Sequence, residues 1–344
     1  MATIAPDAPA QSYVIDDDFR RAITYHLLNG VDKDYLARNV ALETGLPEEV
    51  VAAAIAETRA SPYFQAAQPL RNRLSKYRWV IENGARLSAT DPAALHVPTL
   101  DRPDPRDFHR DHYVAHRPAI IRGLIDHWPA RQNWSLDYVA DRLGDTPVRV
   151  QWGRESDADY EINSHSHGTE RPFAEIAERL RAGASNDFYV TANNSDANQA
   201  AFAPLREDIG DIPGILAHGA AARGFIWIGP KGTITPWHHD LTNNLLLQIV
   251  GRKRVRMVAS HDTPRMRNFK HCFSTWGTDD LLPGPAQGDK PPVLEVVIGP
   301  GDALFLPVGW WHHVEGLDQT IGMSFTGFAW DNDFYSSYDS YGTF

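Results

Sequence analysis

Two histidines and an aspartate stand side by side at positions 238 to 240, where an apolar, strand-like run begins. In an extended strand, residues i and i+2 point to the same face, so His238 and Asp240 can reach one ion while His239 points away. A second pair, His312 and His313, follows the apolar run DALFLPV, and His312 lies 72 residues after Asp240 (312 − 240). Two histidines and one carboxylate leave three metal positions open, as in the facial triad of non-haem Fe(II) oxygenases.

Other interpretations of the HHD cluster remain. The sequence has 15 histidines, so such pairs occur by chance, and a proton-transfer pair or a hydrogen-bonded turn would use the same residues. A four-ligand zinc site is disfavoured because Cys272 is the single cysteine and offers no thiolate partner. No serine lies on a Gly-x-Ser-x-Gly turn, which disfavours a serine nucleophile.

Lys253 is a second candidate for chemistry. It lies in the run GRKRV, where Arg252, Arg254 and Arg256 alternate with it. On a strand the arginines share one face and the lysine faces the barrel interior, where a buried cation needs an anion. The spacing fits a dicarboxylate cosubstrate, and it fits equally a surface lysine that extends its ammonium into water.

The elements that must hold these residues fall into several segments. Residues 1–12 are predicted to be disordered, 13–87 to form a helical domain, and 88–107 to be a proline-rich linker. Residues 108–344 are assigned to a catalytic domain. Its barrel core, about 187–330, contains short strand-like runs separated by Gly and Pro, which predicts an antiparallel barrel or sandwich.

Local patterns define the individual elements. Helices are expected from Asp16 to Gly30, up to Gly45, from Pro47 onward, and in two stretches between 64 and 84. A DNA-binding helix-turn-helix is disfavoured because its second helix would be acidic and rich in alanine. Further predicted elements are helices at 135–144 and 173–182, and strands at 119–121, 147–151 and 187–191.

Composition bounds the protein class. The 344 residues are 42% hydrophobic and 22% charged, which is typical of a globular protein, and the net charge of −11 disfavours nucleic acid as a partner. The N-terminus lacks the features of a secretory signal, and no window is apolar enough to span a bilayer. With one cysteine, this composition predicts a cytoplasmic protein without a membrane partner.

Two motifs resemble a known family. TPWHHD…N…LLLQIVGRKR and PGDALFLPVGWWHHV resemble the JmjC-type 2-oxoglutarate oxygenases, and HRPAIIRGLIDHWPA is similar to the segment that opens such catalytic domains. The resemblance covers about residues 97–330. Within it, the motifs are most similar to the protein-hydroxylase branch that includes the asparaginyl hydroxylase acting on hypoxia-inducible factor.

The resemblance assigns roles to residues. It implies that His238, Asp240 and His312 bind Fe(II), with His312 chosen over its neighbour because the family's ligand follows an aromatic pair. Lys253 would bind the distal carboxylate of 2-oxoglutarate. Four further positions would complete the cosubstrate site: Thr235, Tyr189, Asn244 and Thr326. Of these, Thr326 is the least direct match, because relatives place an asparagine at the next position, which is glycine here.

The resemblance also implies fold and activity. The expected fold is mainly β with α: a double-stranded β-helix (jelly-roll, cupin-like) with flanking helices and an N-terminal all-α domain. The expected activity is a dioxygenase that uses Fe(II), 2-oxoglutarate and O2 to hydroxylate a C–H bond in an amino-acid side group of a protein or peptide, giving succinate and CO2. N-methyl-lysine demethylation, RNA hydroxylation, small-molecule hydroxylation and a non-enzymatic cupin binding protein are the alternatives. A homodimer through the N-terminal helices is left open.

Overall fold

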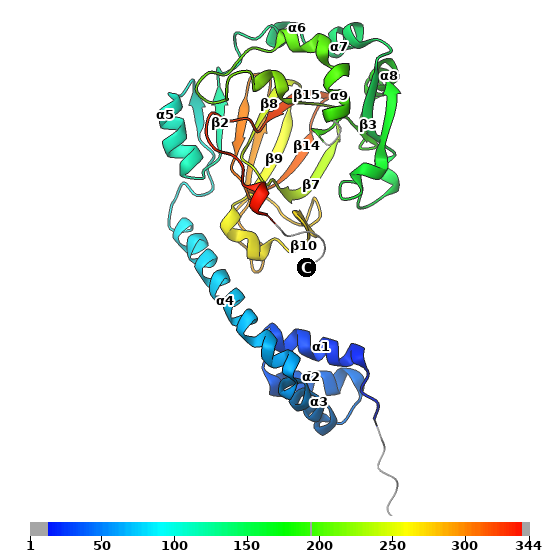
Figure 1. Cartoon of the computed structure of the whole chain (residues 1–344), viewed down its shortest axis with the longest axis vertical. Helices are drawn as coiled ribbons and strands as arrows, with labels where there is room; N and C mark the ends of the chain where they lie inside the picture. The colour runs from blue at the N-terminus through cyan, green and yellow to red at the C-terminus, as the bar shows by residue number, and fades with distance from the viewer. Residues whose placement is uncertain (1–12, 193–194, 339–344) are drawn as a thin grey trace, which may run out of the picture. The chain divides into compact units, whose positions relative to one another are not determined.

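The computed structural model describes residues 13–192 and 195–338, which belong to two compact units divided between Gly84 and Ala85 (Figure 1). Within the described residues, no helix is both long and apolar enough to cross a membrane. Each unit has its own buried core.

The first unit is a bundle of helices whose starts are set by acidic caps. Asp16 accepts a hydrogen bond from the backbone N–H of Phe19 and begins the first helix, and Asp32 caps the second in the same way. The helices are α1 (Asp17–Leu28), α2 (Lys33–Thr44), α3 (Glu48–Ala60) and α4 (Pro62–Ser88).

The stretch predicted as two helices between 64 and 84 is one helix, α4. It continues through Pro69, which lies early in the helix. There the missing N–H removes one helical hydrogen bond, and the other turns of this long helix keep theirs. The prediction of a break was therefore wrong.

The second unit is built on two six-stranded sheets, with antiparallel pairing throughout except between β1 and β2. The first sheet has the order β1 (Thr99–Asp101), β2 (Ala119–Arg122), β13 (Ala303–Leu306), β8 (Asn244–Val250), β15 (Thr320–Phe325) and β6 (Phe225–Gly229). The second has the order β10 (Asn268–Lys270), β11 (Phe273–Ser274), β7 (Ile234–His239), β14 (Trp311–Gly316), β9 (Lys253–Val258) and β12 (Leu294–Ile298). The strand-like runs of the barrel core thus form strands, and the predicted double-stranded β-helix is confirmed.

The predicted linker at 88–107 is partly strand. Strand β1 pairs in parallel with β2, so this stretch forms the edge of the first sheet. The proline-rich composition indicated irregular structure but hid three residues that complete a sheet edge.

Helices and a small third sheet flank the barrel (Figure 1). The third sheet has the order β4 (Gly168–Pro172), β3 (Pro147–Trp152) and β5 (Phe188–Tyr189). The helices are α5 (Pro105–Phe108), which continues as a π-helical turn over His109–Val114, α6 (Ala130–Asn133), α7 (Leu136–Leu143), α8 (Phe173–Arg181) and α9 (Ser195–Ala201). Short 3-10 turns lie at Arg154–Ser156, Ser164–His167, Ala203–Asp208, Ala221–Arg223, Ser260–Arg265 and Tyr335–Ser337.

The first sheet is buried on both faces, which explains its continuous apolar strands. Along β13, Leu304 and Leu306 belong to the apolar cluster that also contains Val255 and Met257 of the second sheet. Phe305 belongs to the cluster that includes the flanking helices. Strands covered on both sides lose the alternation of polar and apolar residues.

Candidate metal centre

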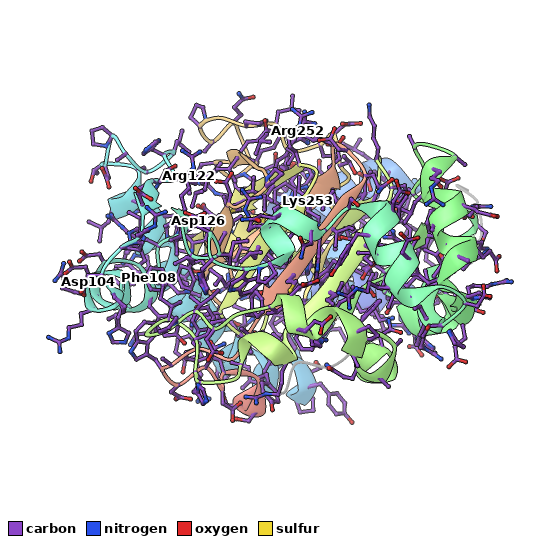
Figure 2. All side chains as sticks on the ribbon, turned by 90° about the horizontal axis from the view of Figure 1, so that it is seen from above. Asp104, Phe108, Arg122, Asp126, Arg252 and Lys253 are labelled. Atoms are coloured by element: carbon purple, nitrogen blue, oxygen red, sulfur yellow. The ribbon has the colours of Figure 1, made fainter. Side chains whose placement is uncertain are left out.

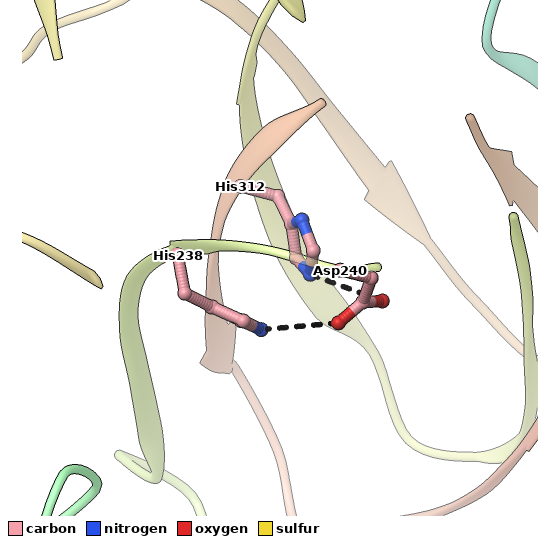
Figure 3. Close-up of side chains that lie close together, drawn as sticks. All are labelled: His238, Asp240 and His312. Atoms are coloured by element: carbon pink, nitrogen blue, oxygen red, sulfur yellow. Dashed lines mark ion pairs between the residues drawn. The ribbon is translucent and has the colours of Figure 1, made fainter. Parts of the chain in front are cut away.

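The three predicted metal ligands meet where two strands of the second sheet pair. His312 on β14 is the register partner of His238 on β7, and Asp240 follows directly after β7. Their candidate ligand atoms all lie within 4.8 Å of one another, and Figure 3 shows the three residues converging. Strand pairing therefore places residues that are distant in sequence around one point.

Hydrogen bonds fix the orientation of both imidazoles. Nδ1 of His238 lies 2.8 Å from the carbonyl oxygen of Pro236, and Nδ1 of His312 lies 3.0 Å from that of Trp310. A ring that donates its Nδ1–H to a carbonyl presents the lone pair of Nε2 to a metal. The two Nε2 atoms lie 3.8 and 3.9 Å from the carboxylate oxygens of Asp240 (Figure 3).

The protonation states suit a cation. Burial, together with the nearby His312, lowers the pKa of His238 to about 4, so its ring is neutral at pH 7. Burial alone would raise the pKa of Asp240, but the two histidines and a hydrogen bond from Asn244 outweigh it and the pKa is lowered. The neutral imidazole of His238 and the ionised carboxylate of Asp240 are thus in the forms that bind a metal.

His239 lies on the other face of the strand, as predicted. Its register partner is Trp311, and its ring packs edge-on against that indole at 4.7 Å. His313 is also turned away from the cluster, and its Nε2 lies 3.1 Å from the hydroxyl of Thr278.

A cavity opens beside the three ligands and extends to Lys253. Its polar lining also includes Tyr189, Thr235 and Asn244. These are four of the five residues predicted to hold the cosubstrate, drawn from strands β5, β7, β8 and β9. The fifth, Thr326, is not among the lining residues, and its carbonyl accepts a hydrogen bond from Asn332.

Lys253 brings a buried basic group to the cavity. The residue is 9% exposed, and its Nζ lies 3.2 Å from the hydroxyl of Tyr189. A buried ammonium bonded to a neutral hydroxyl fits an anionic ligand that would neutralise it.

The neighbouring arginines behave differently. The side chain of Arg252 is 57% exposed and pairs with Asp318. Lys253, the next residue, is buried, and both are labelled in Figure 2. Arg254 pairs with Glu315 and Arg256 with Glu295. The predicted division of this strand into an inner lysine and an outer arginine row is what the structure shows.

Asn244 connects the two halves of the site. Its Nδ2 donates to Oδ2 of Asp240 at 2.9 Å, which orients the carboxylate. Its own Oδ1 is buried and has no hydrogen-bond partner among the residues that the structure describes. That acceptor lies in the cavity lining and is available to a donor on a bound molecule.

Several lining residues were not predicted from the sequence. Trp227, Met323 and Gln248 complete the cavity wall beside the cosubstrate candidates. Gln248 gave a signal, because it interrupts the apolar run NLLLQIV. Trp227 and Met323 sit in apolar strands, where no pattern separates a cavity wall from a packed core.

Comparison with known proteins places the protein in a family. Residues 105–330, well over half of the sequence, match the cupin-like domain, and the chain belongs to that family. The fold and the site agree with the JmjC type of this domain. JmjC enzymes use Fe(II), 2-oxoglutarate and O2, and the His-Asp-His cluster beside a buried lysine fits that set.

Individual relatives differ in what they are named for. Lysine-specific demethylase 8 of Xenopus tropicalis is 31% identical over 249 residues, which cover 69% of this chain and 53% of that protein. The human bifunctional peptidase and (3S)-lysyl hydroxylase JMJD7 is 26% identical, covering 67% of this chain and 84% of that protein. The tRNA wybutosine-synthesizing protein 5 of Danio rerio is 25% identical, covering 72% and 80%. The chain thus spans about half the length of the demethylase that it matches.

Proposed function

We propose that the protein is an Fe(II)- and 2-oxoglutarate-dependent dioxygenase that hydroxylates a C–H bond in an amino-acid side group of a protein or peptide. The observation that carries this proposal is one cavity bounded by His238, Asp240 and His312 at one part of its wall and by Lys253 and Tyr189 at another. A metal triad alone fits many reactions. The buried ammonium adds the requirement for an acidic cosubstrate.

Each residue has a defined task in this proposal. His238, Asp240 and His312 hold the iron, and Asn244 orients the aspartate. The bound iron with 2-oxoglutarate and O2 supplies the chemistry: one oxygen atom enters the substrate C–H bond, and 2-oxoglutarate becomes succinate and CO2. Lys253 neutralises the distal carboxylate of the cosubstrate.

Two hydroxyls and the apolar wall complete the cosubstrate site. Tyr189 and Thr235 line the cavity with the lysine and supply hydroxyls to the same carboxylate. Trp227 and Met323 limit the space for water beside it. Exclusion of water strengthens the ion pair, because the local dielectric constant is lower.

The choice of a protein or peptide substrate is supported by the relatives named for lysine, one of them as a lysyl hydroxylase. The asparaginyl-hydroxylase branch stays a prediction, because those relatives carry other names. The roles of the two domains also stay a prediction: residues 13–87 would present a partner, and residues 108–344 would carry out catalysis.

The test is a search for substrates by mass. Lysate from the host, or a peptide library, is incubated with the protein, Fe(II) and 2-oxoglutarate, and peptides that gain about 16 mass units, one oxygen atom, are sequenced. The gain must disappear with Asp240→Ala and persist with His239→Ala, whose ring points away from the cluster. A gain that survives Asp240→Ala, or no gain in any peptide, would refute the proposal.

Two other reactions share the site. N-methyl-lysine demethylation is favoured by the demethylase relative, and it would be detected as formaldehyde released from methylated peptides. Modification of tRNA is favoured by the wybutosine relative, but the net charge of −11 opposes it. A salt-dependent shift of tRNA on a gel would favour tRNA over a peptide as the substrate.

A further inference from the structure

A fully buried arginine lies behind the cosubstrate cavity and is not part of its lining. Arg154 is 0% exposed and occupies the turn that follows strand β3. Burial of a guanidinium is costly unless the group is paired and hydrogen-bonded. The residues that Arg154 touches therefore indicate which parts of the fold it holds in position.

The first of these contacts is to the strand that carries an iron ligand. Nη2 of Arg154 donates to the carbonyl oxygen of Ile234 at 2.7 Å, and the hydroxyl of Tyr160 donates to the same oxygen at 3.0 Å. The N–H of Ile234 donates to the amide oxygen of Asn186 at 2.8 Å. Both polar groups of this first residue of β7 are therefore held, and the next residue is Thr235 of the cavity.

The second contact is to the phenol of Tyr189. The guanidinium carbon of Arg154 lies 4.3 Å from the ring centre of Tyr160 and 5.4 Å from that of Tyr189. Among residues 13–192 and 195–338, Nε and Nη1 of Arg154 have no hydrogen-bond acceptor, and the two aromatic rings lie within cation–π distance of the guanidinium. Lys253 contacts the hydroxyl of the same Tyr189.

Charge balance supports a fixed position for the guanidinium. Glu161 lies 3.4 Å from Nη2 and is itself 8% exposed, so the pair is buried together. The backbone N–H of Arg154 also bonds to the carbonyl of Asp187, two residues before Tyr189. Backbone and guanidinium thus both connect this turn to the strand that carries the phenol.

From these contacts we infer that Arg154 is a positioning residue for the cosubstrate. It fixes the ring of Tyr189 and the backbone that precedes Thr235, and these two residues supply the hydroxyls beside Lys253. The inference rests on the proposed function, because it requires 2-oxoglutarate to bind in this cavity. Arg154 reaches the cosubstrate only through these two residues, and the metal ligands should be affected much less.

The experiment measures binding of 2-oxoglutarate to protein loaded with Mn(II), by calorimetry, so that no turnover is needed. Arg154→Met keeps most of the length of the residue and removes the charge and the donors. We expect the Kd for 2-oxoglutarate to rise about 10-fold, in the range seen when residues that orient ligands are changed. The Kd for Mn(II) should change less than about 3-fold, and Arg154→Lys should bind 2-oxoglutarate more tightly than Arg154→Met.

Arg206→Met is the matched control. Arg206 is a partly buried arginine of this unit that also donates to a carbonyl, that of Gly224, and it is not among the residues that line the cavity. The Arg206→Met substitution should lower the melting temperature and leave the Kd for 2-oxoglutarate unchanged. Equal effects of the two methionine variants on that Kd would overturn the inference, as would a Mn(II) Kd that rises as much as that for 2-oxoglutarate.

Two further measurements keep the outcomes distinct. Tyr160→Phe removes one donor to Ile234 and keeps the ring, so it should raise the Kd for 2-oxoglutarate even if Arg154→Met does not fold. An unchanged Kd in Tyr160→Phe would then overturn the inference. Wild-type protein that does not bind 2-oxoglutarate would refute the proposed function and this inference together, whereas wild-type binding that is insensitive to Arg154→Met would refute only the inference.

Discussion

Replacing Lys253 by methionine should weaken binding of 2-oxoglutarate by at least about 30-fold. If a carboxylate oxygen takes the 3.2 Å separation that Nζ now has from Tyr189, Coulomb's law gives about 5 kcal/mol at an effective dielectric constant of about 20. Losing one partner of such a buried, hydrogen-bonded charge pair costs about 2–5 kcal/mol. The lower limit corresponds to about a 30-fold change in Kd.

The assay compares two variants of the same strand. Lys253→Met is titrated with 2-oxoglutarate beside Arg254→Met, which removes an equal charge from the outer face, where Arg254 pairs with Glu315. Calorimetry on Mn(II)-loaded protein gives Kd, and an anaerobic Fe(II) titration followed by visible absorbance gives an independent value. If both variants bind 2-oxoglutarate equally well, Lys253 does not receive the carboxylate and the assignment of the cavity is wrong.

Three further predictions concern the metal, the thiol and acid stability. Asp240→Asn should raise the Kd for Fe(II) by more than about 100-fold, beyond the effect of changing a residue that only orients a ligand, and His239→Asn should leave it unchanged in a chelator competition. Partial burial raises the pKa of the Cys272 thiol to about 12, so native protein near pH 8 should resist iodoacetamide, and alkylation as fast as in guanidinium would contradict this protection. Burial lowers the pKa of His313 from an ordinary 6.5 to about 3. The unfolded protein is therefore protonated at this histidine below pH 6.5, whereas the folded protein is protonated there only near pH 3. The free energy of unfolding should therefore fall as the pH decreases from 6.5 to 3. The urea midpoint should depend less steeply on pH in His313→Gln than in the wild type.

The sequence predicted that the three candidate metal ligands come together, because their signal is local. His238 and Asp240 lie two residues apart in a strand, and the turn before His312 contains a proline and a glycine with φ of 72°, Gly309. A spacing of two fixes the face of a strand whatever the tertiary structure is. The inward position of Lys253 followed from the same alternation.

Residues that act across strands were not accessible in this way. Arg154 reaches Ile234 across 80 residues, and nothing in the run GRESDADY distinguishes it from a surface arginine. Thr326, the fifth cosubstrate candidate, stays a prediction, because the cavity lining does not include it. It was assigned by its place next to Gly327 in a motif, but the backbone after β15 leaves the strand direction, and the carbonyl of Thr326 bonds to Asn332 in the following segment.

The charges in and behind the cavity support the proposal that a metal and an anionic cosubstrate bind together. Asp240 and Glu161 contribute two negative charges, and Arg154 and Lys253 contribute two positive charges, so these four residues sum to zero. Fe(II) alone would leave an excess of two positive charges in a poorly hydrated region, and doubly ionised 2-oxoglutarate alone would leave two negative ones. With both bound, the net charge is again zero. Binding either one alone is costly, because it leaves an unbalanced charge in a buried region. Each should therefore bind more tightly when the other is present, and by thermodynamic linkage to the same extent.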